Sequence, residues 1–527
     1  MHKYLTHKNI QILFISLTAL VAIIYPLVTN HIWEDFYITF RHSKNLVDGY
    51  GLVYQPGERV HGFTSAINTL LPAFFYWITN NSFDLTIWLY RLTSIAALIY
   101  GGFFLLRKIQ KIHPDNFITP LLFALLFTFQ AKTIMFTTNG QEAGFMILFL
   151  LPSLFFAYEG FETNWKWAGI CWAGLIYTRP DGVIYIALLS IATVTFGHSS
   201  LKSKADMTAL FRTAIVCAVL YLPWFIFVWI YYGSPIPHTI SAKAGLGGDF
   251  LSDIIHSLQA IISFNPTVGV LALEPTYYHF GGWPYWIKIY AFISWIISSI
   301  YWLIPGNDRL GRFVSFIYTM LIFYLSFLQF RAAVYPWYFP PAEILSIFIL
   351  SSAIYHLPKK LSMFSLTSTY LLGISLLLAA TNIFFMTLNQ ISIQQNIIEN
   401  GNRKQIGLWL NKNKQDGDSV FLEPLGYIGY YSNAKMLDWP GLVSPEVATI
   451  KKDKKGHPYP RIIKQLKPDW VILRPQEIPP LQATDWFLDK YKAVKVFNVK
   501  DRLDQYEYIP GRNYLDFDSI FYIFKKI

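Results

Sequence analysis

The sequence predicts a polytopic α-helical membrane protein with a soluble α/β domain at its C-terminal end. Hydrophobic residues make up 54% of the 527 residues and charged residues only 14%, whereas soluble domains average about 25% charged residues. Apolar segments of the length that crosses a bilayer recur up to residue 388. The net charge of +11 is spread over the loops between these segments, which argues against a nucleic-acid partner.

We expect about 11 transmembrane helices, because about 20 apolar residues are needed to cross the hydrocarbon. The predicted spans are 8–30, 84–106, 115–136, 142–158, 164–178, 182–197, 208–232, 286–304, 311–330, 338–356 and 363–388. Residues 64–79 are also apolar, but this stretch is shorter and lies between Gly62 and Asn80. Its length favours an interfacial or re-entrant helix.

Basic residues in the short loops predict the orientation of the chain. If residues 64–79 do not cross, these residues all fall on the side of the N-terminus. They are Lys3, Lys8, Arg107, Lys108, Lys111, Lys166, Lys202, Lys204, Arg309, Arg312, Lys359 and Lys360. The positive-inside rule then places the N-terminus in the cytoplasm and the C-terminus outside.

Two domains follow from this organisation. Residues 1–388 form the membrane module, with a first outer loop at 31–83 and a long outer loop at 233–285. Residues 389–527 are richer in charge and contain strand-like runs at 419–422, 469–473 and 494–499. We expect this C-terminal part to be an α/β domain on the outer side.

Several ionisable residues lie unexpectedly at the outer ends of predicted spans, where charge near hydrocarbon is costly and usually marks a functional site. They are Glu34, Asp35, Glu142, Arg179, Asp181 and Arg331. Adjacent carboxylates repel, which raises one pKa and suits a general base or a ligand pair for a divalent ion. Arginines suit a phosphate. The structural alternatives are a solvated loop start for the acidic pair, an Arg179–Asp181 salt bridge, a first-turn carboxylate at Glu142 and snorkelling of Arg331.

Motifs along nearly the whole chain resemble a bacterial branch of the GT-C glycosyltransferases. The first loop carries EDFYITFR at 34–41 and NLVDGYGLVYQPGERVHGFTS at 45–65. Weaker matches are NGQE at 139–142, TRPDG at 178–182, YYGSPIPHTISAK at 231–243 and, in the tail, GYYS, LD and GLVSP at 429–445. The chain resembles the arabinofuranosyltransferase-like members more than it resembles the aminoarabinose and protein mannose transferases. Glu34, where the family commonly has Asp, Gln141 and His238 depart from its pattern.

The resemblance implies an inverting glycosyltransferase of the bacterial inner membrane. Such enzymes move a sugar from a polyprenyl-phosphate donor to an envelope acceptor, which would be a lipopolysaccharide, another glycan or a protein. Asp35 is the expected general base, and Glu34 its partner. The expected phosphate-binding residues are Arg179, Lys243, Arg331, Arg41 and Arg59, and the expected substrate-binding residues are Glu142, Asp181, His61, His238 and Tyr338. No cofactor is required, although Glu34 and Asp35 are candidate ligands for Mg²⁺, Mn²⁺ or Ca²⁺.

Three other functions compete with this hypothesis. A transporter or flippase for a lipid-linked sugar also places charges within the membrane, but the sequence shows no convincing internal repeat. A non-enzymatic envelope scaffold would not need Asp35. An oligosaccharyltransferase would carry a Trp-Trp-Asp-Tyr-Gly block in its tail, where this chain has only Asp438-Trp439-Pro440-Gly441.

Overall fold

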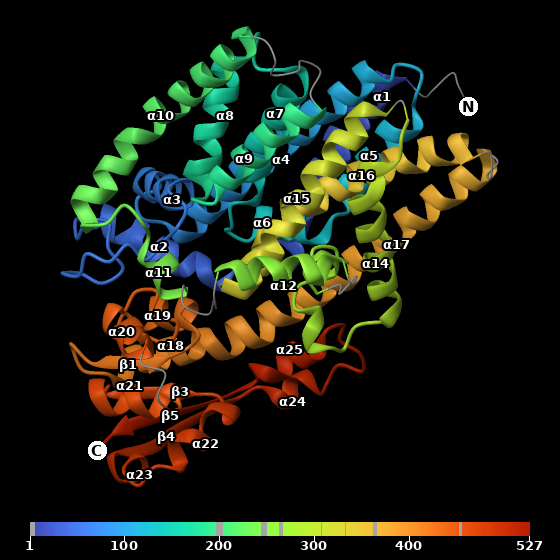
Figure 1. The fold of residues 1–527 in the computed structure, drawn as a ribbon. Helices are drawn as coiled ribbons and strands as arrows, with labels where there is room; N and C mark the ends of the chain where they lie inside the picture. Colours follow the sequence, from blue (N-terminus) through green and yellow to red (C-terminus); the bar gives the residue numbers. More distant parts are fainter. Residues whose placement is uncertain are drawn as a thin grey trace.

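The structure is a computed structural model that describes residues 6–196, 204–243, 250–262, 267–306, 308–331, 334–361, 366–452 and 456–527. Figure 1 shows a bundle of long helices, with the C-terminal strands gathered at the end of the molecule opposite the N-terminus. Two of the basic residues used to predict the orientation, Lys3 and Lys202, lie outside the described residues, as do the side chains of Lys204, Lys359 and Lys360.

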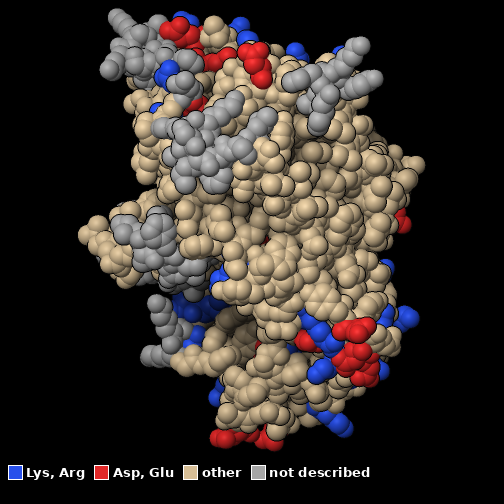
Figure 2. Space-filling model, turned by 90° about the vertical axis from the view of Figure 1, so that its right-hand side faces the viewer, with Lys and Arg blue, Asp and Glu red and all other residues tan. Residues whose placement is uncertain are grey.

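Seven helices are long and apolar enough to cross a membrane. They are α1 (His7–Thr29), α4 (Phe83–Ile112), α10 (Lys204–Tyr232), α14 (Tyr285–Ile300) together with the turn η2 (Tyr301–Leu303) that continues it, α15 (Arg309–Arg331), α16 (Pro340–Leu361) and α17 (Leu366–Ile393). An eighth span is formed if α5 (Ile118–Thr128) and α6 (Ala131–Thr138), bent by 51°, cross together. Figure 2 shows a broad, largely uncharged band between charged residues above and below it, as expected for a surface that faces lipid.

The remaining three predicted spans are shorter helices. They are α7 (Ala143–Glu159), α8 (Trp165–Thr178) and α9 (Gly182–Phe196), with 17, 14 and 15 residues. A rise of 1.5 Å per residue gives them lengths of about 21 to 26 Å, less than the ~30 Å of hydrocarbon. All eleven predicted segments are therefore helical, but three of them are too short to cross unless the helices around them complete the span.

The outer loops carry short helices. In the first loop, α2 (Glu34–Val47) is followed by α3 (Ile67–Ile78), which lies within the stretch predicted to be interfacial or re-entrant. Its 12 residues reach only about 18 Å. The second loop contains α11 (His238–Lys243), α12 (Phe250–Ile262), α13 (Thr267–Leu271) and η1 (Tyr278–Phe280), and η2 (Tyr301–Leu303) and η3 (Pro336–Tyr338) are short 3-10 turns near helix ends.

A single long helix connects the membrane bundle to the C-terminal domain. Helix α17 continues through a π-helical segment, η4 (Gln394–Arg403), into α18 (Lys404–Asn413), and Figure 1 shows this orange helix leaving the bundle toward the red strands. A π-helical insertion of this kind often lies at a functional site. The π-helical segment changes which side chains of the helix face the bundle, at the point where the helix meets the first loop.

The C-terminal domain is an α/β unit around a mixed five-stranded sheet of order β2-β1-β3-β5-β4. Strand β1 pairs in parallel with β2 and β3, and β5 pairs antiparallel with β3 and β4. The strands are β1 (Ser419–Leu422), β2 (Lys435–Asp438), β3 (Trp470–Leu473), β4 (Tyr491–Asn498) and β5 (Ile520–Lys526). The three predicted strands are confirmed, whereas β2 and β5 were not predicted. The helices are α19 (Leu425–Ser432), α20 (Pro445–Lys452), α21 (Pro458–Leu466), η5 (Pro475–Glu477), α22 (Pro479–Gln482), α23 (Phe487–Lys490), α24 (Lys500–Leu503) and α25 (Arg512–Phe517).

Helix α19 attaches this domain to the first outer loop. The Tyr37 ring on α2 packs 4.4 Å from the Tyr427 ring, centroid to centroid, and Arg41 donates a 2.9 Å hydrogen bond to the Gly429 carbonyl. At Gly426 a Cβ atom would lie 2.1 Å from the Glu34 carbonyl oxygen. Only glycine permits this approach, so α19 lies directly against the start of α2.

Candidate active site

A charged cavity lies where the membrane module meets the C-terminal domain. Its volume is about 130 Å³. Its walls come from the start of α2, the end of α11, the turn before α16, the π-helical segment η4 and the loop between β1 and α19. The charged residues in its lining are Glu34, Asp35, Lys243, Glu399, Arg403 and Glu423.

A second cavity of about 60 Å³ lies on the other side of Asp35. Glu142, Arg179 and Tyr338 line it, together with residues of the first loop. Asp35 and Lys243 line both cavities. One carboxylate and one amine therefore stand at the junction of two polar hollows.

Packing around Trp33 positions Asp35. Trp33 precedes the first turn of α2, and its N–H donates a 2.8 Å hydrogen bond to the Asn139 carbonyl. Its ring packs against the rings of Phe136 and Trp337, at 5.0 and 5.9 Å between centroids. Asp35 consequently lies in the first turn of a fixed helix, where the helix dipole favours a carboxylate.

Burial and one nearby cation set the electrostatics of Asp35. Burial raises the pKa of the Asp35 carboxyl, and the Lys243 ammonium opposes this shift. Burial likewise lowers the pKa of Lys243, while Asp35 raises it. The Lys243 amine lies 4.6 Å from the centre of the Tyr335 ring. Among the described residues no carboxylate lies within ion-pair distance of Lys243, so its charge remains available to an anionic ligand.

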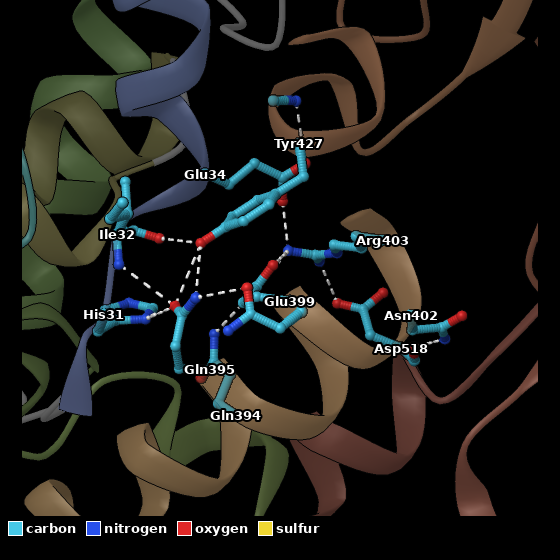
Figure 3. A network of polar contacts seen from close by, with 12 residues as sticks. His31, Ile32, Glu34, Gln394, Gln395, Glu399, Asn402, Arg403, Tyr427 and Asp518 are labelled. Atoms are coloured by element: carbon cyan, nitrogen blue, oxygen red, sulfur yellow. Dashed lines mark hydrogen bonds and ion pairs between the residues drawn. The ribbon is translucent and has the colours of Figure 1, made fainter. Parts of the chain in front are cut away.

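Glu34 belongs to an ionic cluster with residues of η4 and the C-terminal domain (Figure 3). Its Oε2 lies 2.5 Å from Arg403 Nη1, and its Oε1 accepts a 3.1 Å hydrogen bond from the Gly426 N–H. Arg403 also pairs with Glu399 at 3.0 Å and with Asp518 at 2.5 Å. Burial and these neighbouring carboxylates raise the pKa of Glu34 to about 8, although Arg403 acts in the opposite direction.

The cluster extends through a second arginine. Arg474 pairs with Asp518 at 2.5 Å, Glu423 at 2.7 Å and Glu477 at 3.0 Å. Two guanidinium groups thus face five carboxylates. Glu399 and Asp518 are almost fully buried, whereas Glu34, Glu477 and Glu423 are partly exposed.

Both carboxylate oxygens of Glu34 have partners, Arg403 on one and the Gly426 N–H on the other. A metal site at Glu34 and Asp35 stays a prediction. The mechanism proposed below routes no step through a metal.

A polar network ties the end of α1 to the same cluster (Figure 3). The His31 ring bonds the Gln395 side-chain oxygen at 2.8 Å, and the Tyr427 hydroxyl donates to the Ile32 carbonyl at 2.9 Å. Gln395 in turn donates to Tyr427 at 3.1 Å. Burial lowers the pKa of His31 to about 3, so its ring is neutral. The network holds residues 31 and 32 against η4 and α19.

The structure places Arg179 and its neighbours beside the second cavity. Arg179 forms 2.9 Å ion pairs with both Glu142 and Asp181, and its guanidinium lies 4.1 Å above the Tyr338 ring. The structural alternative of an Arg179–Asp181 salt bridge is therefore observed. The same arginine lines the cavity, so it stands close to Asp35 but with its charge already balanced.

Six predicted site residues line neither cavity. Asp181 pairs with Arg179, Arg331 pairs with Asp253 on α12 at 3.2 Å, and Arg41 bonds backbone carbonyls of the C-terminal domain. The other three are Arg59, which lies over the Tyr231 ring, His61, which stacks on the Tyr232 ring, and His238, whose backbone N–H donates to the His61 carbonyl. Asp35 and Arg179 thus line one cavity, and Arg331 lies apart from it.

Sequence reasoning missed Arg403, Glu399 and Glu423, all of which line the larger cavity. Arg403 and Glu399 lie four residues apart, just after the last apolar span. A polar segment that continues a membrane helix without a break was the available signal. Glu423 carried no such signal, because its position depends on the sheet.

Comparisons with known proteins agree with this architecture. Residues 390–515 match a domain of unknown function, DUF8728, and no curated protein matches the sequence. The chain is similar to a crystal structure of ArnT from Cupriavidus metallidurans bound to undecaprenyl phosphate. That likeness has a TM-score of 0.53 at 11% identity and covers 97% of each chain.

Two further structures are similar. One is the archaeal oligosaccharyltransferase AglB from Archaeoglobus fulgidus, in complex with an inhibitory peptide and a dolichol-phosphate. Its TM-score is 0.51 at 12% identity, and the match covers 88% of this chain and 69% of that one. The other is the arabinofuranosyltransferase AftD from Mycobacteria, at a TM-score of 0.48 and 13% identity, covering 96% of this chain and 39% of that one. The fold is that of a polytopic membrane protein with a C-terminal domain. More particularly, it is the fold that the ArnT and AglB structures share.

Proposed function

We propose that the protein is an inverting glycosyltransferase that transfers a sugar from a lipid-phosphate donor, with Asp35 as the general base. One observation carries this proposal. The buried Asp35 carboxylate and the Lys243 ammonium, which has no ion-pair partner among the described residues, stand together at the junction of two polar cavities. Proton removal requires a base, and departure of a phosphate requires a nearby cation.

In the reaction an acceptor hydroxyl attacks the anomeric carbon while Asp35 takes its proton. The bond between the anomeric carbon and the phosphate oxygen breaks, and the lipid phosphate leaves with the electron pair. Attack opposite the leaving group inverts the anomeric centre. General-base assistance is typically worth 10²–10⁴-fold. Lys243, aided by Arg179, stabilises the negative charge that develops on the leaving phosphate.

An apolar groove supports a donor with a long hydrocarbon chain. It lies between α14, α16 and α17, has a volume of about 370 Å³ and is lined almost entirely by apolar side chains, among them Ile293, Leu350 and Leu376. The ArnT and AglB structures hold undecaprenyl phosphate and a dolichol-phosphate. Both observations favour a polyprenyl-phosphate sugar as the donor.

We place the reaction on the outer face of a bacterial inner membrane, with an envelope lipid, glycan or protein as the acceptor. Helix α4 begins beside the first loop and ends in a basic segment that contains Arg107, Lys108 and Lys111. This basic end is opposite the Asp35 cavities, as the positive-inside rule requires. A cysteine at the exposed Asn413 should react with an impermeant thiol reagent from outside the cell, whereas one at the exposed Lys166 should not.

The charged cavities also bear on the transporter alternative. They lie at one end of the membrane helices, whereas transporter substrates usually bind near the bilayer midplane. The geometry therefore favours chemistry at one face over movement across the membrane.

The decisive experiment is a transfer assay in membranes with a panel of polyprenyl-phosphate sugars. Asp35→Asn keeps the shape of the side chain and removes the base, so we expect at least a 100-fold loss of transfer. Asp48→Asn at the C-terminal cap of the same helix is the matched control, since Asp48 pairs with Lys44 and should leave transfer unchanged. Wild-type turnover by Asp35→Asn would exclude Asp35 from the mechanism.

A further inference from the structure

A trio of metal-ligating side chains lies at the other end of the membrane bundle. His113, Asp308 and His356 each offer a ligand atom, and these atoms all lie within 4.8 Å of one another. Within the described ranges it is the one such group of three. His7 at the start of α1 bonds the Pro114 carbonyl at 2.8 Å, so the trio belongs to the face that carries the N-terminus.

The trio joins three helices that are distant in sequence. His113 is the C-terminal cap of α4, Asp308 precedes α15, and His356 lies in the last turns of α16. Asp308 is 3% exposed and the His113 side chain 18% exposed. The ligand atoms are thus shielded but within reach of an ion from solvent.

The spacing of the ligand atoms fits a metal ion better than a direct contact. His113 Nε2 lies 3.8 Å from Asp308 Oδ1, which is longer than a hydrogen bond. Two ligands on one tetrahedral ion, each at 2.0–2.2 Å from it, stand about 3.3 to 3.6 Å apart. The rings of His113 and His356 lie 5.3 Å apart, at an angle of 57°. A small closing movement would bring all three groups onto one ion.

The carboxylate is held ready for such an ion. Tyr301 donates a 2.7 Å hydrogen bond to Asp308 Oδ2, Ser352 donates to the same oxygen, and the Gly311 N–H donates to Oδ1 at 2.9 Å. Hydrogen bonds of this kind orient metal ligands. Oδ1 keeps a second acceptor position for a metal.

We propose that His113, Asp308 and His356 bind one divalent transition-metal ion, and that Zn²⁺ is the ion these ligands suit best. Three protein ligands leave a fourth position for water. The ion would tie the ends of α4, α15 and α16 together on the face opposite the Asp35 cavities. It does not take part in the transfer reaction, and the proposal does not depend on the proposed function.

The test uses the full-length chain, purified in detergent with a tag that contains no histidine and freed of metal with a chelator. Zn²⁺ is titrated calorimetrically, and Co²⁺ is then bound so that its visible absorption reports the coordination. The variants are His113→Gln and His356→Gln. His7→Gln, on the same face but outside the trio, is the matched control.

We expect one Zn²⁺ per chain for the wild type and for His7→Gln, and binding at least tenfold weaker for each trio variant. The metal-free melting temperatures should agree within about 2 °C, which shows that the variants are folded. Zinc binding that is unchanged in both trio variants would overturn the proposal. A wild-type protein that takes up no zinc, and whose trio binds only protons in a pH titration, would also overturn the proposal.

Discussion

Arg403 should be the most sensitive residue of the C-terminal domain, because it is one of two arginines that compensate a cluster of five carboxylates. Its guanidinium pairs with Glu34, Glu399 and Asp518 and is only 4% exposed. Arg403→Met keeps the length of the side chain and removes the charge. Glu34 and Glu399 would then lose their arginine partner, and Asp518 would keep Arg474.

The magnitude follows from the cost of breaking a buried ion pair, about 3–5 kcal/mol. At about 3 °C per kcal/mol, the melting temperature should fall by about 9 to 15 °C. The loss should be smaller at pH 6 than at pH 8.5, because protonation of the abandoned carboxylates relieves their repulsion. Scanning fluorimetry of the purified protein measures both effects.

Arg512→Met is the matched control, since it removes one positive charge from the same domain. Arg512 is 29% exposed and pairs with Asp504 and Asp516 at the surface, and such pairs contribute at most about 1 kcal/mol. Adding Glu34→Gln to Arg403→Met should restore part of the lost stability. A melting temperature for Arg403→Met no lower than that of Arg512→Met would refute the reasoning, as would a double variant less stable than the single one.

Three further predictions concern the site itself. Lys243→Met should lower the transfer rate by about 10²–10³-fold, and Lys243→Arg should retain part of the rate. Equal rates for Lys243→Met and the wild type would contradict the role of the ammonium. Transfer should rise with pH as Asp35 loses its proton, and this rise should lie above the ordinary aspartate range because the pKa of Asp35 is raised. Lys243→Met removes the positive charge, so the rise should move to higher pH. In Lys243→Arg a positive charge remains, so the rise should move less. The folded state holds the Glu34 proton more tightly than the unfolded state, since the pKa of Glu34 rises from 4.5 to about 8. The resulting stabilisation is complete below pH 4.5 and is lost as the pH rises through 8, so melting temperatures measured from pH 5 to 9 should fall, and less steeply in Glu34→Gln.

The membrane helices and the first-loop acidic pair were predictable because they depend on local properties. Hydropathy over about 20 residues predicts a span without knowledge of its neighbours. A charge that interrupts the end of such a span is visible in the same way, which is how Asp35 was found. The three strands predicted in the C-terminal domain also followed from short runs of β-branched and aromatic residues.

The partners of Asp35 were not predictable in this way. Lys243 and Arg331 looked equally suited to a phosphate, yet Lys243 lines both cavities and Arg331 pairs with Asp253 on a surface helix. Arg403 comes from a π-helical turn hundreds of residues away from Glu34.

The sequence by itself therefore determined that this is a membrane protein and where the carboxylate that we propose as the base lies along the chain, because hydropathy and local charge are written in consecutive residues. Only the tertiary structure decided which cations reach that carboxylate and that the C-terminal domain completes its cavity. Those contacts depend on how α2, α11, η4 and α19 pack together, and close packing between distant segments leaves no local pattern in a single sequence.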